Sequence, residues 1–134
     1  MADWILPLFL GGFEAIAKEG KTVEGRAPDP TKPEKDYDKI KKGDRVIFRA
    51  ISDQDFKPLG KGDMTFPVEY NHKYHERNAQ LSVFKMLQRE GLEKLLPGCT
   101  SIAEGIEIYM NLPGYSERIQ RYGIHAIGLG KRIS

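Results

Sequence analysis

Residues 20–26 read Gly-Lys-Thr-Val-Glu-Gly-Arg, and this short segment carries the most information in the chain. Its length and β-branched content predict a strand. Side chains alternate between the two faces of a strand, so Thr22, Glu24 and Arg26 are expected on one face at intervals of about 7 Å. The opposite face is expected to carry Lys21 together with a valine and a bare glycine. One face is therefore polar and the other is mostly apolar.

Two interpretations of the polar face are open. If it points outward, it is an ordinary solvated strand surface. If it points into a cleft, the Glu24 carboxylate and the Arg26 guanidinium form a recognition pair. The planar fork of arginine suits a phosphate or a base edge, and a carboxylate accepts a hydrogen bond from an exocyclic amine. Burial of the two side chains decides between these interpretations.

Composition limits the class of protein. A chain of 134 residues and 15.2 kDa has the usual size of one domain, so residues 1–134 are predicted to form a single fold. The longest apolar stretch, Trp4–Leu10, is far too short to cross a bilayer, and Asp3 precedes it where a secretory signal would carry positive charge. A lone cysteine, Cys99, cannot form an internal disulfide. We therefore expect a cytoplasmic protein with no membrane partner.

The charge balance argues against a general attraction to nucleic acid. Lysine plus arginine number 21 and aspartate plus glutamate number 19, so the formal net charge is only +2. A polyanion would have to bind in a local groove, because the field of the whole molecule is weak.

The periodicity along the chain predicts a mixed α+β fold, a small β-barrel with a curved, mostly antiparallel sheet and short surrounding helices. The predicted strands are Trp4–Leu10, Lys21–Arg26, Arg45–Ile51, Met64–Tyr74 and His125–Ile133. Short helices are predicted after Gly11-Gly12, from a Ser82 cap, from a capping box at Ser101 and Glu104, and over Tyr115–Tyr122. Three prolines predict that Ala27–Lys35 is an extended loop. Proline and glycine residues in Asp53–Asp63 predict a long hairpin connection. Pro67 predicts that its strand lies at a sheet edge or contains a bulge.

Three segments resemble a known family. They are FEAIAKEGKTVEGR (Phe13–Arg26), DYDKIKKGDRVIF (Asp36–Phe48) and the region Val83–Ile127, which contains FKMLQREGLEKLLPG and YSERIQRYGIHAI. Together they resemble the ASCH domain, a PUA-like β-barrel family, and in particular its small stand-alone archaeal and bacterial members. The resemblance implies a cleft lined by the polar face of Lys21–Arg26 and a role in RNA metabolism or regulation. The expected partner is RNA, a nucleotide or a modified nucleoside.

Other residues add to the predicted RNA-binding set of Lys21, Thr22, Glu24 and Arg26. The region around Tyr70 and Lys73 is the densest basic and aromatic stretch, which is typical of a stacking platform for single-stranded RNA. The alternative is an exposed strand kept soluble by its charges. Further phosphate contacts near the last strand are offered by Arg118, Arg121 and Tyr122.

The resemblance also raises an enzymatic alternative, a small hydrolase. Some similar proteins act as amidohydrolases on acetylated cytidine with a lysine, a threonine three residues later and a distant glutamate, and another relative acts as a ribonuclease. Lys21 matches that lysine and Glu90 matches that glutamate, but Glu24 stands where the threonine is expected. A carboxylate is not a hydroxyl nucleophile, so the mechanism is not inherited intact. Glu24 would instead have to orient a water as general base, with Lys21 stabilising an oxyanion.

No metal site and no cofactor are expected. His72 and His75 are three residues apart in a predicted strand, which places them on opposite faces. A third class of function is a protein-interaction domain without a ligand. A concave pocket beside Lys21, Glu24 and Arg26 would favour a binding module or an enzyme, and a convex surface there would favour the interaction domain.

Overall fold

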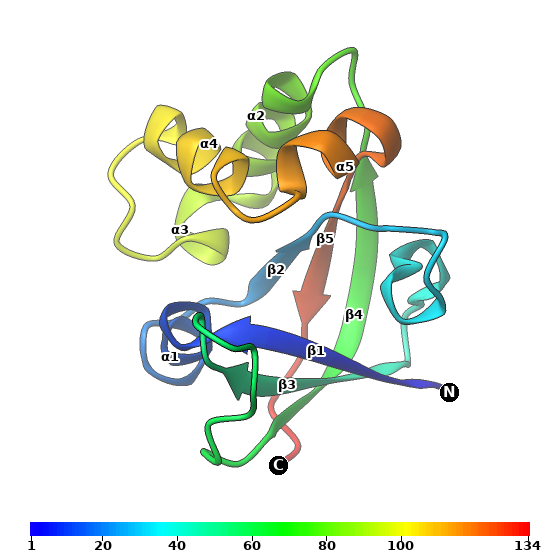
Figure 1. Ribbon diagram of the computed structural model, residues 1–134, viewed down its shortest axis with the longest axis vertical. Coiled ribbons are helices and arrows are strands. Elements are labelled where there is room, and N and C mark those ends of the chain that lie inside the picture. Colours follow the sequence, from blue (N-terminus) through cyan, green and yellow to red (C-terminus); the bar gives the residue numbers. More distant parts are fainter.

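The chain folds around one curled sheet that forms a half-barrel (Figure 1). The computed structural model describes residues 1–134. Four of the five strands pair antiparallel and β1 pairs parallel with β3, in the order β1-β3-β4-β5-β2. The predicted α+β class with a curved, mostly antiparallel sheet is confirmed. The strands are β1 (Asp3–Phe9), β2 (Val23–Arg26), β3 (Arg45–Ile51), β4 (Met64–Tyr74) and β5 (Ile124–Leu129).

Short helices surround this sheet. The helix α1 follows β1 directly, whereas α2, α3, α4 and α5 gather over the other end of the molecule (Figure 1). Two 3₁₀ turns, Pro33–Lys35 and Tyr37–Lys39, interrupt the proline-rich loop. No helix is long and apolar enough to span a bilayer. The α-helices are α1 (Leu10–Lys18), α2 (Ala79–Glu90), α3 (Leu92–Leu95), α4 (Ile102–Met110) and α5 (Tyr115–Tyr122).

The long strand β4 connects the two ends of the molecule (Figure 1). Its first half pairs with β3 and its second half pairs with β5. The register shifts between Val68 and Tyr70, directly after Pro67, so the predicted bulge is present. A bulge increases local twist and bends the strand. This bend separates two hydrophobic cores.

Each core has its own set of buried side chains. The barrel core contains Phe48, Met64 and Ile127, and the helix core contains Met86 and Ala126. Since Ile127 and Ala126 are neighbours in β5, the two faces of this strand serve different cores. We call these the barrel face and the helix face of the sheet.

Several local predictions need correction. Gly11 lies within α1, which already begins at Leu10, so the glycine pair does not delay the helix. Helix α2 begins at Ala79, because the side chain of Asn78 accepts a hydrogen bond from the Leu81 amide. Ser82 is buried inside this helix and is not its cap.

Two other boundaries came out as expected. The hydroxyl of Ser101 accepts a hydrogen bond from the Glu104 amide at 3.1 Å, as its capping role requires. Helix α5 has the predicted bounds, Tyr115–Tyr122. Strand β1 lies at an edge of the sheet, where Ile5 is 52% exposed, so it is less buried than an apolar run suggests.

Candidate functional site

A pocket of about 820 Å³ lies beside β2. One wall comes from β1 and the start of α1, and the opposite wall comes from α4, α5 and the connection that follows α3. Lys21, Glu24, Gly25 and Arg26 are among the lining residues. The surface beside Lys21, Glu24 and Arg26 is therefore concave, as expected for a binding module or an enzyme and not for an interaction domain without a ligand.

Three charged side chains form a buried ion network at this pocket. Lys21, Glu24 and Arg26 are 7%, 4% and 6% exposed. One Glu24 oxygen, Oε1, lies 3.2 Å from Lys21 Nζ, and the other, Oε2, accepts a 2.7 Å hydrogen bond from Arg26 Nε. The outward, solvated interpretation of this face is excluded by the burial of Glu24 and Arg26.

Backbone carbonyls hold the two cations of this network. Lys21 Nζ donates to the Leu95 carbonyl at 2.5 Å, and Arg26 Nη2 donates to the Pro7 carbonyl at 2.6 Å. The first bond ties the segment before β2 to α3, and the second ties β2 itself to β1. Buried charges need this kind of pairing, because a charge without a partner is strongly disfavoured in the interior.

Thr22 does not belong to this site. The strand begins only at Val23, and Gly20 has a φ of +83°, so the chain turns before Lys21 instead of running straight through it. Thr22 is exposed, and its amide donates to the Lys94 carbonyl. The alternation of side chains along a strand predicted that Thr22 shares a face with Glu24, and this prediction is wrong. Because the chain turns at Gly20, the side chain of Lys21 lies beside Glu24 instead.

Aromatic rings line much of the pocket. Tyr109 and Tyr115 stack with their centroids 6.3 Å apart, and Phe9 stacks on Phe56 at 5.9 Å. Tyr37 also faces the pocket. Burial raises the pKa of Tyr115 to about 12, so at neutral pH its hydroxyl is protonated and both donates and accepts hydrogen bonds. Flat rings beside a charged floor suit a flat polar ligand.

Gly25 leaves room for one of these rings. A Cβ at this position would lie 2.5 Å from the Tyr109 hydroxyl oxygen, and Tyr109 is itself only 3% exposed. We expect Gly25→Ala to lower the free energy of unfolding by about 1–3 kcal/mol, because Tyr109 has little space to move. Chemical denaturation measures the difference.

Gly11→Ala is the matched control. A Cβ at Gly11 meets no atom within 4 Å and the residue lies in α1, so this change is expected to stabilise by up to about 1 kcal/mol. Equal stability of the Gly25 and Gly11 variants would contradict the tight contact with Tyr109.

Glu90 lies on the other face of the sheet and does not line the pocket. Its Oε2 accepts a 2.5 Å hydrogen bond from the Tyr74 hydroxyl and lies 2.8 Å from His72 Nδ1. His72 pairs with Ala126, which packs in the helix core, whereas Glu24 pairs with Ile127 of the barrel core. The structure therefore does not bring Glu90 to Lys21, and the expected pairing of these two residues is not formed.

Most of the remaining predicted RNA-binding residues also lie outside the pocket. Tyr70 stacks on His72 at 4.3 Å, and its pKa is raised to about 12, first by burial and then by the Glu90 carboxylate. Lys73 Nζ lies 3.3 Å from Asp38. Arg121 is exposed on α5. These side chains therefore form no single site with Arg26.

Sequence reasoning missed most of the residues that the helical half contributes to the pocket, although it named Arg118 as a further phosphate contact. Leu95 supplies the carbonyl that binds Lys21, and Tyr115 and Arg118 come from one face of α5. Their three-residue spacing on a helix indicates a shared face, but not what that face covers. No group of three or more histidine, cysteine, aspartate and glutamate side chains is arranged to hold a metal ion.

A buried histidine lies close to the site. Arg26 pairs across the strands with His125, which is 2% exposed. Asn71 donates through Nδ2 to two backbone carbonyls, so its oxygen accepts from His125 Nδ1 at 2.8 Å. This arrangement fixes the tautomer with the proton on Nδ1. His125 Nε2 is 3.0 Å from Asp38 Oδ1 but makes no hydrogen bond of acceptable geometry.

This histidine predicts a loss of stability in acid. Burial lowers the pKa of His125, and the charge of Lys73 lowers it as well. The carboxylates of Asp38 and Asp36 act in the opposite direction but do not outweigh burial. As the pH falls below about 6.5, the unfolded chain takes up the proton before the folded chain does. The neutral, buried His125 therefore contributes its full stabilisation above about pH 6.5. This contribution is lost as the pH falls towards the lower pKa of the folded state, by at most about 1.4 kcal/mol per pH unit.

Denaturation curves across this pH range test the histidine. His125→Gln is expected to remove the corresponding part of the slope, whereas the exposed His75, changed in the same way, is expected to leave it unchanged. An identical slope in wild type and His125→Gln would show that another group is responsible.

Comparison with known proteins identifies the fold but no function. No protein-family model and no curated protein matches the chain. The crystal structure of hypothetical protein PH0355 is similar over 98% of this chain and 99% of that one, with 29% identity and a TM-score of 0.71. The solution NMR structure of protein PF0455 from Pyrococcus furiosus is similar over 95% and 94% of the two chains, with 28% identity and a TM-score of 0.61. The whole α+β fold, including the helical half, is shared with these proteins.

Proposed function

We propose that this chain is an ASCH-like, PUA-like module that binds a nucleotide or a short stretch of single-stranded RNA in the pocket beside β2. The observation that carries the proposal is the buried ion pair of Glu24 and Arg26 at the surface of an aromatic-lined cavity. A fixed acid and a fixed guanidinium side by side offer acceptors and donors to one planar group. The resemblance of the GKTVEGR segment to the ASCH family supports the same ligand class.

The network leaves polar capacity for a ligand. A guanidinium carries five N–H donors, and Arg26 uses one on Glu24 and one on the Pro7 carbonyl. Each Glu24 oxygen has a cation partner and retains a second acceptor direction. The free donors suit the acceptors of a base edge, and the free acceptor sites suit an exocyclic amine. The partly exposed Tyr115 supplies ring surface for stacking.

The hydrolase alternative finds less support in this arrangement. Lys21 Nζ is already engaged by the Leu95 carbonyl and by Glu24, and Glu90 lies on the opposite face of the sheet. We therefore favour binding over an amide hydrolase or ribonuclease that uses Lys21 and Glu90 together.

A titration tests the proposal. Fluorescence anisotropy of a labelled short single-stranded RNA, at low and moderate salt, is expected to show saturable binding. Arg26→Gln is expected to weaken binding about tenfold or more, because it removes a charged hydrogen-bond donor. Tyr115→Leu is expected to weaken binding about fivefold or more, because it removes a stacking surface without touching the ion network.

The controls separate binding from folding. Tyr122 lies on the same helix as Tyr115 but not in the pocket, so Tyr122→Leu is expected to bind within about twofold of wild type. Circular dichroism confirms that each variant is folded. Absence of binding in the wild type, or wild-type affinity in folded Arg26→Gln and Tyr115→Leu, would rule out this pocket as the RNA site.

A further inference from the structure

Two of the four cations that line the pocket have no acidic partner. Lys21 and Arg26 share the Glu24 carboxylate. Lys35 and Arg118 also line the pocket, but neither forms a salt bridge, and neither side chain makes a hydrogen bond. Lys21 and Arg26 thus have a carboxylate as partner, whereas Lys35 and Arg118 add positive charge to the pocket without one.

Arg118 is held in position although its guanidinium has no hydrogen-bond partner. Its Cζ lies 5.2 Å from the centroid of the Tyr115 ring, a cation–π contact. Nη1 lies close over Gly114, where an added Cβ would approach it to 2.6 Å. The Nε atom is shielded from solvent and makes no hydrogen bond. A buried N–H without a partner is rare in proteins and calls for an explanation.

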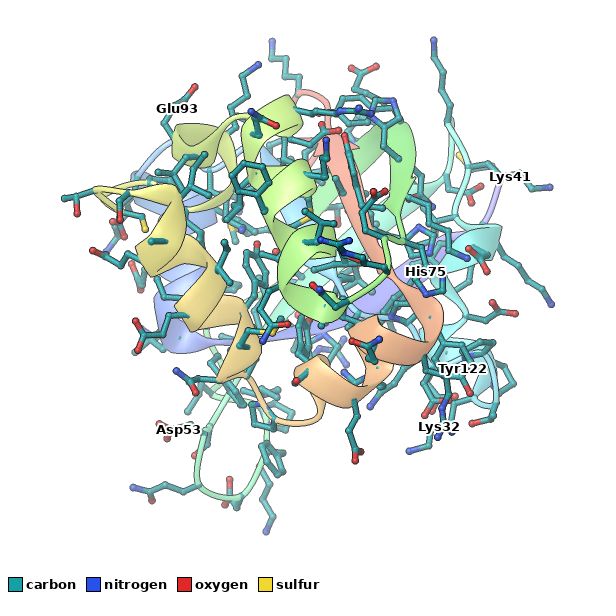
Figure 2. The ribbon with its side chains drawn as sticks, turned by 90° about the horizontal axis from the view of Figure 1, so that it is seen from above. Lys32, Lys41, Asp53, His75, Glu93 and Tyr122 are labelled. Atoms are coloured by element: carbon teal, nitrogen blue, oxygen red, sulfur yellow. The ribbon has the colours of Figure 1, made fainter.

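Lys35 faces the same cation. It is half-buried at the end of the first 3₁₀ turn, and its pKa is lowered by burial first and then by the nearby charges of Arg118 and Lys32. The Asp29 and Glu34 carboxylates oppose this shift but form no ion pair with Lys35, and Asp29, whose pKa the charge of Arg118 helps to lower, forms none with Arg118. Asp29 instead accepts hydrogen bonds from the amide and hydroxyl of Thr31. Figure 2 shows Lys32, three residues before Lys35, on a different side of the molecule from the loop that carries Asp53.

We propose that Lys35 and Arg118 form an anion subsite that takes the phosphate of a nucleotide whose base occupies the pocket. This inference rests on the proposed function and names its ligand more narrowly, as a nucleoside phosphate or an RNA phosphate. The arginine fork bonds two phosphate oxygens at once, and the lysine ammonium adds a point charge. Bound phosphate would accept hydrogen bonds from the Nη groups of Arg118, which have no partner, and would relieve the repulsion between the two cations.

Calorimetric titration with ribonucleosides and with their 5′-monophosphates tests the subsite. The monophosphate is expected to bind about tenfold or more tightly than the matching nucleoside. Lys35→Gln and Arg118→Gln are each expected to reduce this preference to threefold or less, measured as the ratio of the monophosphate and nucleoside affinities of the same variant. Inorganic phosphate is expected to compete with the monophosphate and not with the nucleoside.

Neighbouring cations outside the pocket give the matched controls. Lys32 lies three residues before Lys35, and Arg121 lies three residues after Arg118, but neither lines the pocket. Lys32→Gln and Arg121→Gln are expected to keep the phosphate preference. Equal affinity of wild type for nucleoside and monophosphate, or a preference that survives in the Lys35→Gln/Arg118→Gln double variant, would overturn the subsite alone. Failure of every nucleoside and nucleotide to bind would overturn the proposed function as well.

Discussion

Replacing Glu24 with alanine is expected to lower the free energy of unfolding by about 3–5 kcal/mol, the largest effect of any single polar change in this protein. The Glu24 side chain is 5% exposed, and those of Lys21 and Arg26 are 5% and 8% exposed. Without the carboxylate, two cations remain buried with only backbone carbonyls as partners. Chemical denaturation at neutral pH measures the loss.

Two further variants show whether burial is the cause. Glu14→Ala breaks a solvent-exposed ion pair with Lys18 and is expected to leave the free energy of unfolding almost unchanged. The triple variant Lys21→Met/Glu24→Leu/Arg26→Leu replaces the whole network by apolar groups and is expected to recover most of the stability. The same variant is expected to lose RNA binding. A Glu24→Ala protein as stable as Glu14→Ala would contradict the buried network.

Truncation of one large side chain in either hydrophobic core is expected to destabilise the whole chain. Phe48 is fully buried in the barrel core and Met86 is fully buried in the helix core. We expect Phe48→Ala to lower the free energy of unfolding by about 3–5 kcal/mol and Met86→Ala by about 2–5 kcal/mol. The exposed Ile5 at the sheet edge, changed to alanine, is expected to matter little.

The shape of these transitions tests the expectation of a single domain. β4 and β5 contribute side chains to both cores, so the two cores are expected to unfold together in one transition. Tryptophan fluorescence reports the barrel end through Trp4, and circular dichroism reports the helices. Two separate midpoints for the two signals would show that the cores are independent units.

Local pattern predicted much of this fold. The alternation of Val46, Phe48 and Ala50 is the buried face of β3, and Ser101 is the cap of α4. Both signals depend on neighbours a few residues away in the chain. The order of the strands was not predictable in this way, because the parallel pairing of β1 with β3 joins segments about 40 residues apart.

The candidate site shows the same limit. Glu24 and Arg26 were predicted correctly as a polar pair because a strand fixes their spacing. Because the chain turns at Gly20, the side chain of Lys21 lies beside Glu24 and Thr22 is exposed. Glu90 reached a different face because α2 packs over His72, and no local pattern contains that information. Tertiary contact alone brings Arg118 into the pocket.

The most direct test of ligand binding at Glu24 and Arg26 is an amide NMR titration with the short single-stranded RNA. We expect progressive, saturable shifts concentrated at Glu24, Gly25, Arg26 and Tyr115, with little change at Tyr70 and Lys73 of β4. Shifts confined to Tyr70, Lys73 and Arg121, or no shifts at any RNA concentration, would contradict ligand binding at Glu24 and Arg26.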